Sequence, residues 1–289
     1  MDFRSIGMGV LFSLMWSSAF ATARVIVAHA PPLYALTLRF LLSGLIAIAL
    51  ARALGQSWRL SPAQWRVVVI FGICQNALYL GLNFIGMQWI EASLAVIIAS
   101  TMPLMVAAFG WAFHGEKLRP IGLLGMIAGF AGVALIMGTR LSGGVDLTGV
   151  ILCVIGAMGL AVATLLVRGV SSGGNLLMVV GLQMLVGSGV LAVVAVVLET
   201  PVVTWDWRLL AAFFYQILIP GLAATLLWFA LVGRIGAVRA STFHFLNPFF
   251  GVAIAAALLG EKVQALDFVG VAIIMAGILA VQMSKTAPR

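Results

Sequence analysis

Acidic side chains are scarce in this sequence, which has eight Asp and Glu residues among 289. Charged residues of both signs make up 8% of the chain and hydrophobic residues 63%, with a mean hydropathy of +1.20. An ordinary soluble domain is about a quarter charged. Runs such as 67–90, 92–115 and 240–260 contain no charged residue, and each is long enough to cross a bilayer as a helix of about 20 residues. The composition therefore excludes a soluble domain and predicts a membrane protein.

Patterns that carry catalysis or bind metals are also missing. Neither H-E-x-x-H nor G-x-S-x-G occurs, and His29, His114 and His244 lie far apart in the sequence. Cys74 and Cys153 lie inside apolar runs and indicate two small buried side chains rather than a disulfide framework. We expect no catalytic residue, no metal and no cofactor, and an intramembrane enzyme is the least favoured class.

An all-α polytopic membrane protein is the predicted fold class, because β-barrel alternation is absent and helices satisfy their own backbone in lipid. The first span, with Arg4 before it and A-T-A at 21–23, also fits a secretory signal sequence, but the repeat described below requires it as a helix. Ten transmembrane helices are predicted, over residues 5–27, 33–52, 65–88, 91–113, 119–139, 147–168, 174–198, 209–232, 238–259 and 265–284.

Positive charge is distributed unevenly along the chain. With an even number of spans, both termini lie on one side, where eleven of the sixteen Lys and Arg residues fall, and four fall on the other side. The positive-inside rule places both termini in the cytoplasm. We therefore interpret the net charge of +8 as a topology signal in a lipid bilayer and expect no nucleic-acid partner.

The sequence repeats itself at an offset of 145 residues. Pro103 aligns with Pro248, and Gly-Glu-Lys at 115–117 aligns with Gly-Glu-Lys at 260–262. Several matches in one register, at equivalent places in two helix pairs, indicate an internal duplication rather than chance.

Each copy carries five helices, so we divide the single transmembrane domain into repeats 1–144 and 145–289. Because five is odd, the second copy must be inverted in the membrane relative to the first. Inverted repeats are typical of secondary transporters, whose two halves exchange conformations. Duplication for assembly alone is the alternative.

W-S-S-A-F at 16–20, L-R-F at 38–40 and the two Pro…Gly-Glu-Lys segments resemble the drug/metabolite transporter superfamily, in its EamA-type branch of two five-helix repeats. The likeness covers nearly the whole chain. The chain also looks like the YddG-type exporters of aromatic amino acids, both overall and in the stretch H-F-L-N-P-F-F around Pro248. The resemblance implies export of small amino-acid-like metabolites across a bacterial inner (plasma) membrane, without catalysis.

Prolines mark candidate gates. Pro103 and Pro248 lack an N–H, so we expect them to free the carbonyls of Ala99 and His244 near the middle of helices four and nine. Broken helices near the midplane build sites and gates in transporters, although a static kink satisfied by a neighbouring helix is the alternative. Pro220 predicts a third break, in helix eight, without a proline at the equivalent position of helix three.

Small and polar residues line one face of the third helix, at spacings of three and four that keep them together. Interhelical hydrogen bonding and a cavity wall are both open for this stripe, which consists of Gly72, Asn76, Tyr79, Asn83 and Gly86. An aromatic pocket with a few orienting polar groups would suit a bulky apolar substrate. The predicted substrate-binding residues are Trp16, Asn76, Tyr79, Asn83, Trp228, His244, Asn247 and Phe249.

Ionisable groups inside the spans are few. Arg39 could contact a substrate carboxylate or snorkel to the outer interface, and as part of the family's L-R-F feature it is more simply structural. No carboxylate lies deep in any span, which disfavours coupling through a buried acid. His244 is the one candidate proton carrier, and a lone buried histidine is more often a neutral hydrogen-bonding partner. We therefore expect a facilitator or exchanger with weak or no proton coupling.

Three transport classes remain open for the function: an amino-acid exporter, which we favour, a multidrug or organic-cation exporter, and a channel-like facilitator of small metabolites. The lack of deep acids disfavours cations, although aromatic cages can bind them.

A glycine face on the fifth helix predicts close packing against another helix, with dimerisation as a second possibility. We expect a monomer or weak homodimer. This face consists of Gly122, Gly125, Gly129 and Gly132.

Overall fold

The computed structural model of the protein describes residues 2–115, 118–167 and 173–286, and this part is all-helical. Ten of its helical stretches are long and apolar enough to cross a membrane, and each begins and ends within three residues of the prediction. The elements in chain order are α1 (Phe3–Val27), α2 (Pro32–Ala53), α3 (Pro62–Phe71), η1 (Gly72–Tyr79), α4 (Leu80–Gly86), α5 (Ala92–Ser100), α6 (Met102–His114), α7 (Pro120–Ser142), α8 (Leu147–Leu166), α9 (Leu176–Leu198), α10 (Trp207–Gln216), η2 (Ile217–Ala223), α11 (Ala224–Ile235), α12 (Ala237–Ser241), η3 (Thr242–Leu246), α13 (Asn247–Leu259) and α14 (Ala265–Thr286).

Local sequence explains where several helices begin. Ser61 and Gln64 form a capping box at the start of α3, in which Ser61 Oγ accepts from Gln64 N–H and Gln64 Oε1 accepts from Ser61 N–H. Asp146 caps α8 by accepting from the N–H of Thr148 at 2.7 Å. Pro32, Pro62 and Pro120 occupy first-turn positions, where a missing N–H costs nothing.

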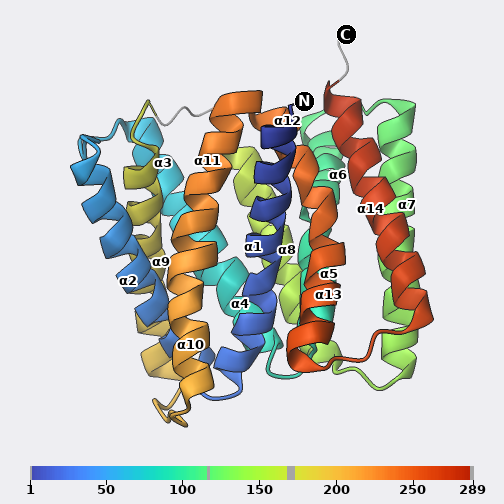
Figure 1. Ribbon diagram of the computed structural model, residues 1–289, viewed down its shortest axis with the longest axis horizontal. Coiled ribbons are helices and arrows are strands. Elements are labelled where there is room, and N and C mark those ends of the chain that lie inside the picture. Colours follow the sequence, from blue (N-terminus) through green and yellow to red (C-terminus); the bar gives the residue numbers. More distant parts are fainter. Residues whose placement is uncertain (1, 116–117, 168–172, 287–289) are drawn as a thin grey trace.

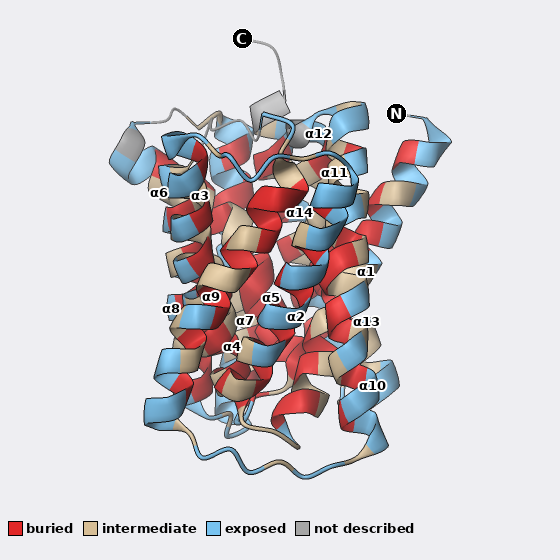
Figure 2. Cartoon of the chain, turned by 90° about the vertical axis from the view of Figure 1, so that its left-hand side faces the viewer, coloured by how far each residue is buried: buried red, intermediate tan, exposed pale blue. Residues whose placement is uncertain are grey.

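Helices α1 and α14 define the two ends of the bundle. α1 begins and α14 finishes on the same side of the bundle, which we call the upper end (Figure 1). The opposite side, which α1 reaches at its last residues, is the lower end. Exposed positions lie mostly on the outward sides of the helices and buried ones face inward (Figure 2). Large apolar side chains such as Leu124 and Phe268 are 67% and 65% exposed, as expected for surfaces that face hydrocarbon.

Two helix pairs flank the central helices, α2 with α9 on one side and α7 with α14 on the other (Figure 1). Glycines allow the backbones to approach closely, because a Cβ at Gly125 would lie 2.8 Å from the carbonyl oxygen of Gly277, and one at Gly181 would lie 3.0 Å from that of Gly44. The glycine face of the fifth span is therefore occupied by α14 of the same chain. The close packing predicted for this face is therefore made within the chain.

Irregular helical turns occur at equivalent places in the two halves. The third and eighth spans contain π-helical segments, η1 and η2, whose starts at Gly72 and Ile217 are 145 residues apart. Pro220, where a break was predicted, lies inside η2, and the eighth span continues through it as one helical stretch. The third span has its π-helical segment in the same register although it has no proline, so the feature is shared by both halves. π-helical turns inside α-helices are frequent at functional sites.

The fourth and ninth spans are also interrupted at equivalent places. α5 ends at Ser100 and α6 begins at Met102, while α12 passes through the 3₁₀ segment η3 into α13 at Asn247. Pro103 and Pro248 lie in the first turns of α6 and α13, where proline is compatible with a helix. Both interruptions therefore lie directly before the prolines that the sequence singled out.

Candidate substrate site

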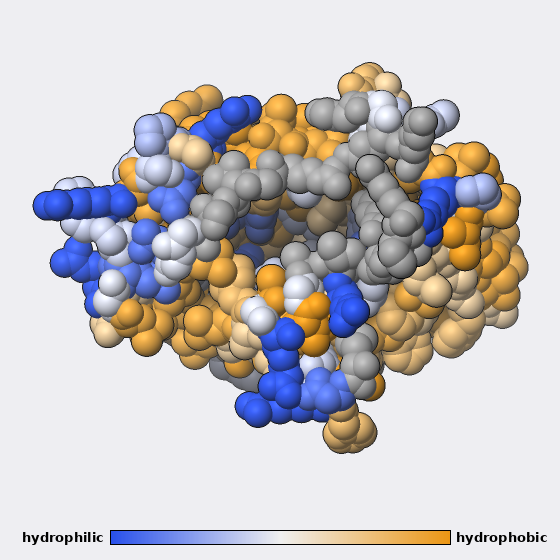
Figure 3. Space-filling view, turned by 90° about the horizontal axis from the view of Figure 1, so that it is seen from above, coloured by the Kyte–Doolittle hydropathy of each residue, from blue (hydrophilic) through white to orange (hydrophobic). Residues whose placement is uncertain are grey.

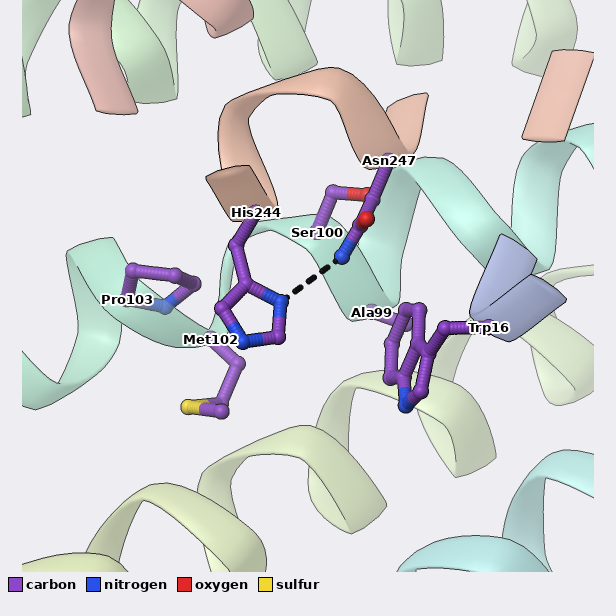
Figure 4. Close-up of a pocket in the computed structure, with 7 residues that line it drawn as sticks. All are labelled: Trp16, Ala99, Ser100, Met102, Pro103, His244 and Asn247. Carbon is purple, nitrogen blue, oxygen red and sulfur yellow. Dashed lines mark hydrogen bonds between the residues drawn. The ribbon is translucent and has the colours of Figure 1, made fainter. Parts of the chain in front are cut away.

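A small cavity lies where the two interrupted spans meet. Its walls come from the junction of α5 with α6, from the junction of η3 with α13, and from α1 (Figure 4). At an offset of 145, Ala99, Met102 and Pro103 correspond to positions 244, 247 and 248, so the cavity joins equivalent segments of the two repeats. Its lining residues are Trp16, Ala99, Ser100, Met102, Pro103, His244 and Asn247.

Two polar side chains of this cavity, His244 and Asn247, come from the second repeat. Asn247 Nδ2 lies 2.9 Å from His244 Nδ1 (Figure 4). Because an amide nitrogen only donates, Nδ1 is the acceptor and His244 is neutral with its proton on Nε2. This Nε2–H has no hydrogen-bond acceptor among the described residues, and Asn247 Oδ1 is buried without a partner. One donor and one acceptor are thus available to a ligand.

Aromatic rings surround the imidazole of His244. The centroids of Phe12, Trp16 and Trp228 lie 5.4, 5.9 and 5.2 Å from that of His244, with Phe12 and Trp16 meeting it edge-on. Trp16 also meets Phe20 edge-on at 5.5 Å. Ring pairs at these separations are attractive and hold their members in defined orientations. The structure therefore brings together Trp16, Trp228, His244 and Asn247, four of the eight predicted substrate-binding residues.

The sequence predicted a free carbonyl at His244, and the structure differs there. The carbonyl of His244 accepts from the N–H of Asn247 in the 3₁₀ turn of η3. This tighter turn re-satisfies the carbonyl that Pro248 releases, so it is not free to line the cavity.

The cavity is narrow in this conformation. Its volume is about 20 Å³, comparable to the space that one water molecule needs. Ser100, missed by the sequence reasoning, lines it and donates from Oγ to the carbonyl of Val96 at 2.6 Å. Its position next to a predicted proline break was the available signal. A substrate of amino-acid size requires the two interrupted spans to separate.

Close packing seals the cavity on its lower side. Val96 and Gly251 lie one helical turn below it, on α5 and α13, and a Cβ at Gly251 would lie 2.8 Å from Val96 Cβ. Further down, the Glu261 carboxylate accepts from the backbone N–H groups of Ala92 and Ser93 at 2.7 and 2.9 Å. Glu261 thus caps α5 from the other repeat.

Buried ion pairs also hold the lower end together. Arg140, 7% exposed, donates to Glu91 at 2.6 Å and to Asp267 at 2.8 Å. Arg24 donates to the carbonyl of Met87 at 2.6 Å. Arg140 ties the end of α7 to the starts of α5 and α14, and Arg24 ties the ends of α1 and α4 to each other, so the lower end is closed.

The upper end is different. The surface is hollowed between the helices when seen from this end (Figure 3). α6 and α12, the upper halves of the interrupted spans, are not packed against each other in the described part of the chain. The bundle is therefore closed at its lower end and hollowed at its upper end. Glu116 and Lys117, aligned with Glu261 and Lys262, lie outside the described residues.

The predicted stripe on the third span does not reach the cavity. Asn76 Nδ2 donates to the carbonyl of Gln183 on α9 at 2.9 Å. Asn83 Nδ2 donates to the carbonyl of Tyr79 at 2.8 Å, and both residues face Gly156 of α8. The interhelical hydrogen bonding left open from the sequence therefore describes Asn76, whereas Asn83 bonds within its own span and Tyr79 packs against α8.

Two other predicted residues occupy unexpected places. Phe249 is 48% exposed, with its ring 5.5 Å from that of Phe250, and so lies on the surface rather than in the cavity. Arg39 is only 6% exposed, so it does not snorkel to an interface.

The described residues contain no group of three metal-ligating side chains.

Comparison with known proteins gives a consistent result. A model of the EamA-like transporter family matches residues 3–138 and 147–283. A solved crystal structure covers 97% of this chain and 96% of its own, with a TM-score of 0.68 at 21% identity, and supports the fold. The uncharacterized inner membrane transporter YedA of Escherichia coli K12 is 24% identical over 96% of this chain and 90% of its own.

Two relatives have names that mention a substrate. The probable amino-acid metabolite efflux pump of Escherichia coli K12 is 26% identical over 94% of this chain and 92% of its own. The aromatic amino acid exporter YddG of Ancylobacter novellus is 32% identical, but the match covers only 45% of either chain. The narrower likeness to YddG is thus partial.

Proposed function

Since this chain belongs to the EamA-like transporter family, within the drug/metabolite transporter superfamily, we propose that it exports amino acids, with aromatic or bulky apolar side chains preferred, by alternating access. It is a transporter and not an enzyme, and it is a multi-pass protein of the bacterial inner membrane. The observation that carries the proposal is the cavity between equivalent interruptions of the fourth and ninth spans.

The substrate preference rests on the chemistry of that cavity. Trp16 and the neighbouring rings offer aromatic surface, while His244 and Asn247 offer one donor and one acceptor to fix orientation. Fixed cation-binding carboxylates do not line it. This donor set suits an apolar side chain with a polar head group, and the printed names of two relatives point to amino-acid substrates as well.

The direction of transport rests on the asymmetry of the two ends. We place the upper end in the cytoplasm, because the positive residues gather on the side of the termini. The hollow at this end then faces the cytoplasm, where an exporter collects its substrate. Repeats 1–144 and 145–289 would exchange conformations about Pro103, Pro220 and Pro248 to open the lower end.

Transport into proteoliposomes tests the proposal. Saturable uptake and counterflow would be measured with labelled phenylalanine, with all twenty amino acids as competitors and a cationic dye as a second cargo. We expect counterflow by phenylalanine or tryptophan and competition by bulky apolar amino acids. Counterflow of the dye but of no amino acid would favour an organic-cation exporter, and flux that neither saturates nor shows counterflow would favour a channel-like facilitator.

A further inference from the structure

Arg39 is a buried cation that lacks a counter-charge. It lies in α2 with 6% exposure, as buried as Arg140, which has two carboxylate partners. No hydrogen bond or ion pair joins Arg39 to any residue in the described ranges 2–115, 118–167 and 173–286, and its Nε is enclosed without a partner. The ring of Phe40 lies beneath its guanidinium, with the ring centroid 5.1 Å from Cζ.

A lone guanidinium at this depth is costly. A charge within the bilayer core costs several kcal/mol unless it is paired or reaches water. The helices packed beside Arg39 contain no Asp or Glu, namely α2, α9, η1, α4 and η2. Glu199, which follows α9, is already engaged by the backbone N–H groups of Leu33 and Tyr34 at the start of α2. An anion that enters the bundle would supply the missing negative charge, and in a transporter that molecule is the substrate.

Two further unpartnered polar atoms lie next to this region. Ser43 follows Arg39 by one turn on the same face of α2, and its Oγ is buried without a partner, as is Oε1 of Gln216 at the end of α10. Gly221 lets the eighth span approach α2, because a Cβ there would lie 3.4 Å from Ser43 Oγ. Gln216 lies five residues before Gly221 in the same span. The hydroxyl of Ser43, one turn from Arg39, therefore faces the span that carries Gln216.

α1 connects this group to the aromatic cavity. Gln216 Nε2 donates to the carbonyl of Ala19 at 2.7 Å and to Thr22 Oγ1 at 3.1 Å. Ala19 lies one turn beyond Trp16, which lines the cavity. Gln216 is therefore held in place by its amide nitrogen, with its oxygen left over as an acceptor.

We propose that Arg39, Ser43 and Gln216 form the head-group subsite of the substrate. Arg39 and the Ser43 hydroxyl bind the carboxylate, and Gln216 Oε1 accepts from the ammonium group, while the side chain occupies the cavity beside Trp16. This inference rests on the proposed function and narrows it: the cargo carries a carboxylate, and amines without one are excluded. Neither Ser43 nor Gln216 stood out in the sequence.

Matched ligands test the subsite on the wild-type protein. Phenylalanine, phenylalaninamide and phenethylamine share a side chain, but only the first has a carboxylate. A hydrogen bond to a charged group contributes about 1.5–3 kcal/mol, so we expect phenylalanine to compete for counterflow on the order of tenfold or more better than the other two. Equal competition by the three ligands would overturn the proposal.

Variants at Ser43 and Arg39 separate charge from folding. Ser43→Asp places a counter-charge one turn from Arg39; we expect a higher melting temperature and a tenfold or greater loss of phenylalanine affinity, and a clearly smaller loss in the neutral Ser43→Asn. Arg39→Gln should remove the discrimination between phenylalanine and its amide. Retained discrimination in Arg39→Gln, or equal losses in Ser43→Asp and Ser43→Asn, would contradict the subsite.

A separate readout distinguishes failure of the subsite from failure of the proposed function. If the wild-type protein shows no counterflow with any amino acid, the proposed function is wrong. The subsite is then tested by melting temperature with benzoate and benzamide. Stabilisation of the wild type by benzoate alone, lost in Ser43→Asp, supports an anion subsite, and equal responses to the two ligands contradict it.

Discussion

Substitution of Gly251 by alanine should open the lower end of the bundle. An added Cβ would lie 2.8 Å from Val96 Cβ, with both Val96 methyl groups nearer still. Val96 is β-branched and cannot swing aside easily. Overpacking of this kind costs about 1–3 kcal/mol, which corresponds to a roughly 5- to 150-fold change in a two-state equilibrium.

The free-energy cost of the added methyl group should fall mainly on the conformation whose lower end is closed. If the inverted repeats exchange conformations, position 251 takes on the environment that position 106 has here. Val106, a larger residue than alanine, is accommodated there in a half-buried position. The Gly251→Ala variant therefore shifts the population toward the state that is open below, rather than destabilising both states equally.

Spin-label distances measure this shift. Labels on cysteines at Trp89 and Leu258, which are 49% and 66% exposed near the lower end, would be introduced after Cys74 and Cys153 are replaced by alanine. We expect a longer distance to gain population in Gly251→Ala, and a second change, Val96→Ala, to restore the wild-type distribution. Gly189→Ala is the matched control, because a Cβ there meets no atom within 4 Å. An unchanged distribution in Gly251→Ala, or a shift that Val96→Ala does not reverse, would refute the reasoning.

Three further predictions concern the cap, the aromatic wall and the histidine. Glu261→Gln weakens the cap on α5, which should lower the melting temperature by a few degrees in a thermal scan and widen the lower-end distance. Trp16→Ala should reduce the apparent affinity of phenylalanine in counterflow competition about tenfold or more. Phe249→Ala, on the exposed surface, should leave that affinity unchanged. Because His244 is neutral and accepts from Asn247, counterflow in wild type and His244→Gln should vary little between about pH 6 and 8, and an imposed pH step should not drive accumulation.

The sequence predicted the number and limits of the spans because charge-free length is a strong signal. The offset of 145 residues located Pro103 and Pro248, and the backbone interruptions occur directly before them. The asymmetry between Ala99 and His244, and between Met102 and Asn247, was also readable, and these four residues line the same cavity.

Partners across helices were harder to predict. Spacing places Asn76, Tyr79 and Asn83 on one face of the third span but does not reveal which helix meets that face. Phe249 follows an irregular stretch in which the 3₁₀ turns of η3 rotate the helix face, so a regular period misplaced it. The π-helical segment η1 has no sequence signal comparable to Pro220.

Unsatisfied atoms are likewise invisible in a sequence. Ser43 and Gln216 are ordinary polar residues in apolar helices until the structure shows their oxygens buried without partners. Arg39 looked like a side chain able to reach an interface, and only its burial excludes that alternative. Such features depend on packing between α2 and the eighth span, which are about 180 residues apart in the chain.

Substrate protection at Ser100 tests the central claim most directly. A single cysteine at this position, in a background without Cys74 and Cys153, lines the cavity between the two interrupted spans. We predict that the amino acids that drive counterflow slow the alkylation of this cysteine. The protection should depend on amino-acid concentration in the same way as transport does. Alkylation of a cysteine at the exposed Ser142 should be unaffected. Alkylation at position 100 that stays unchanged while phenylalanine counterflow saturates would contradict binding at this site.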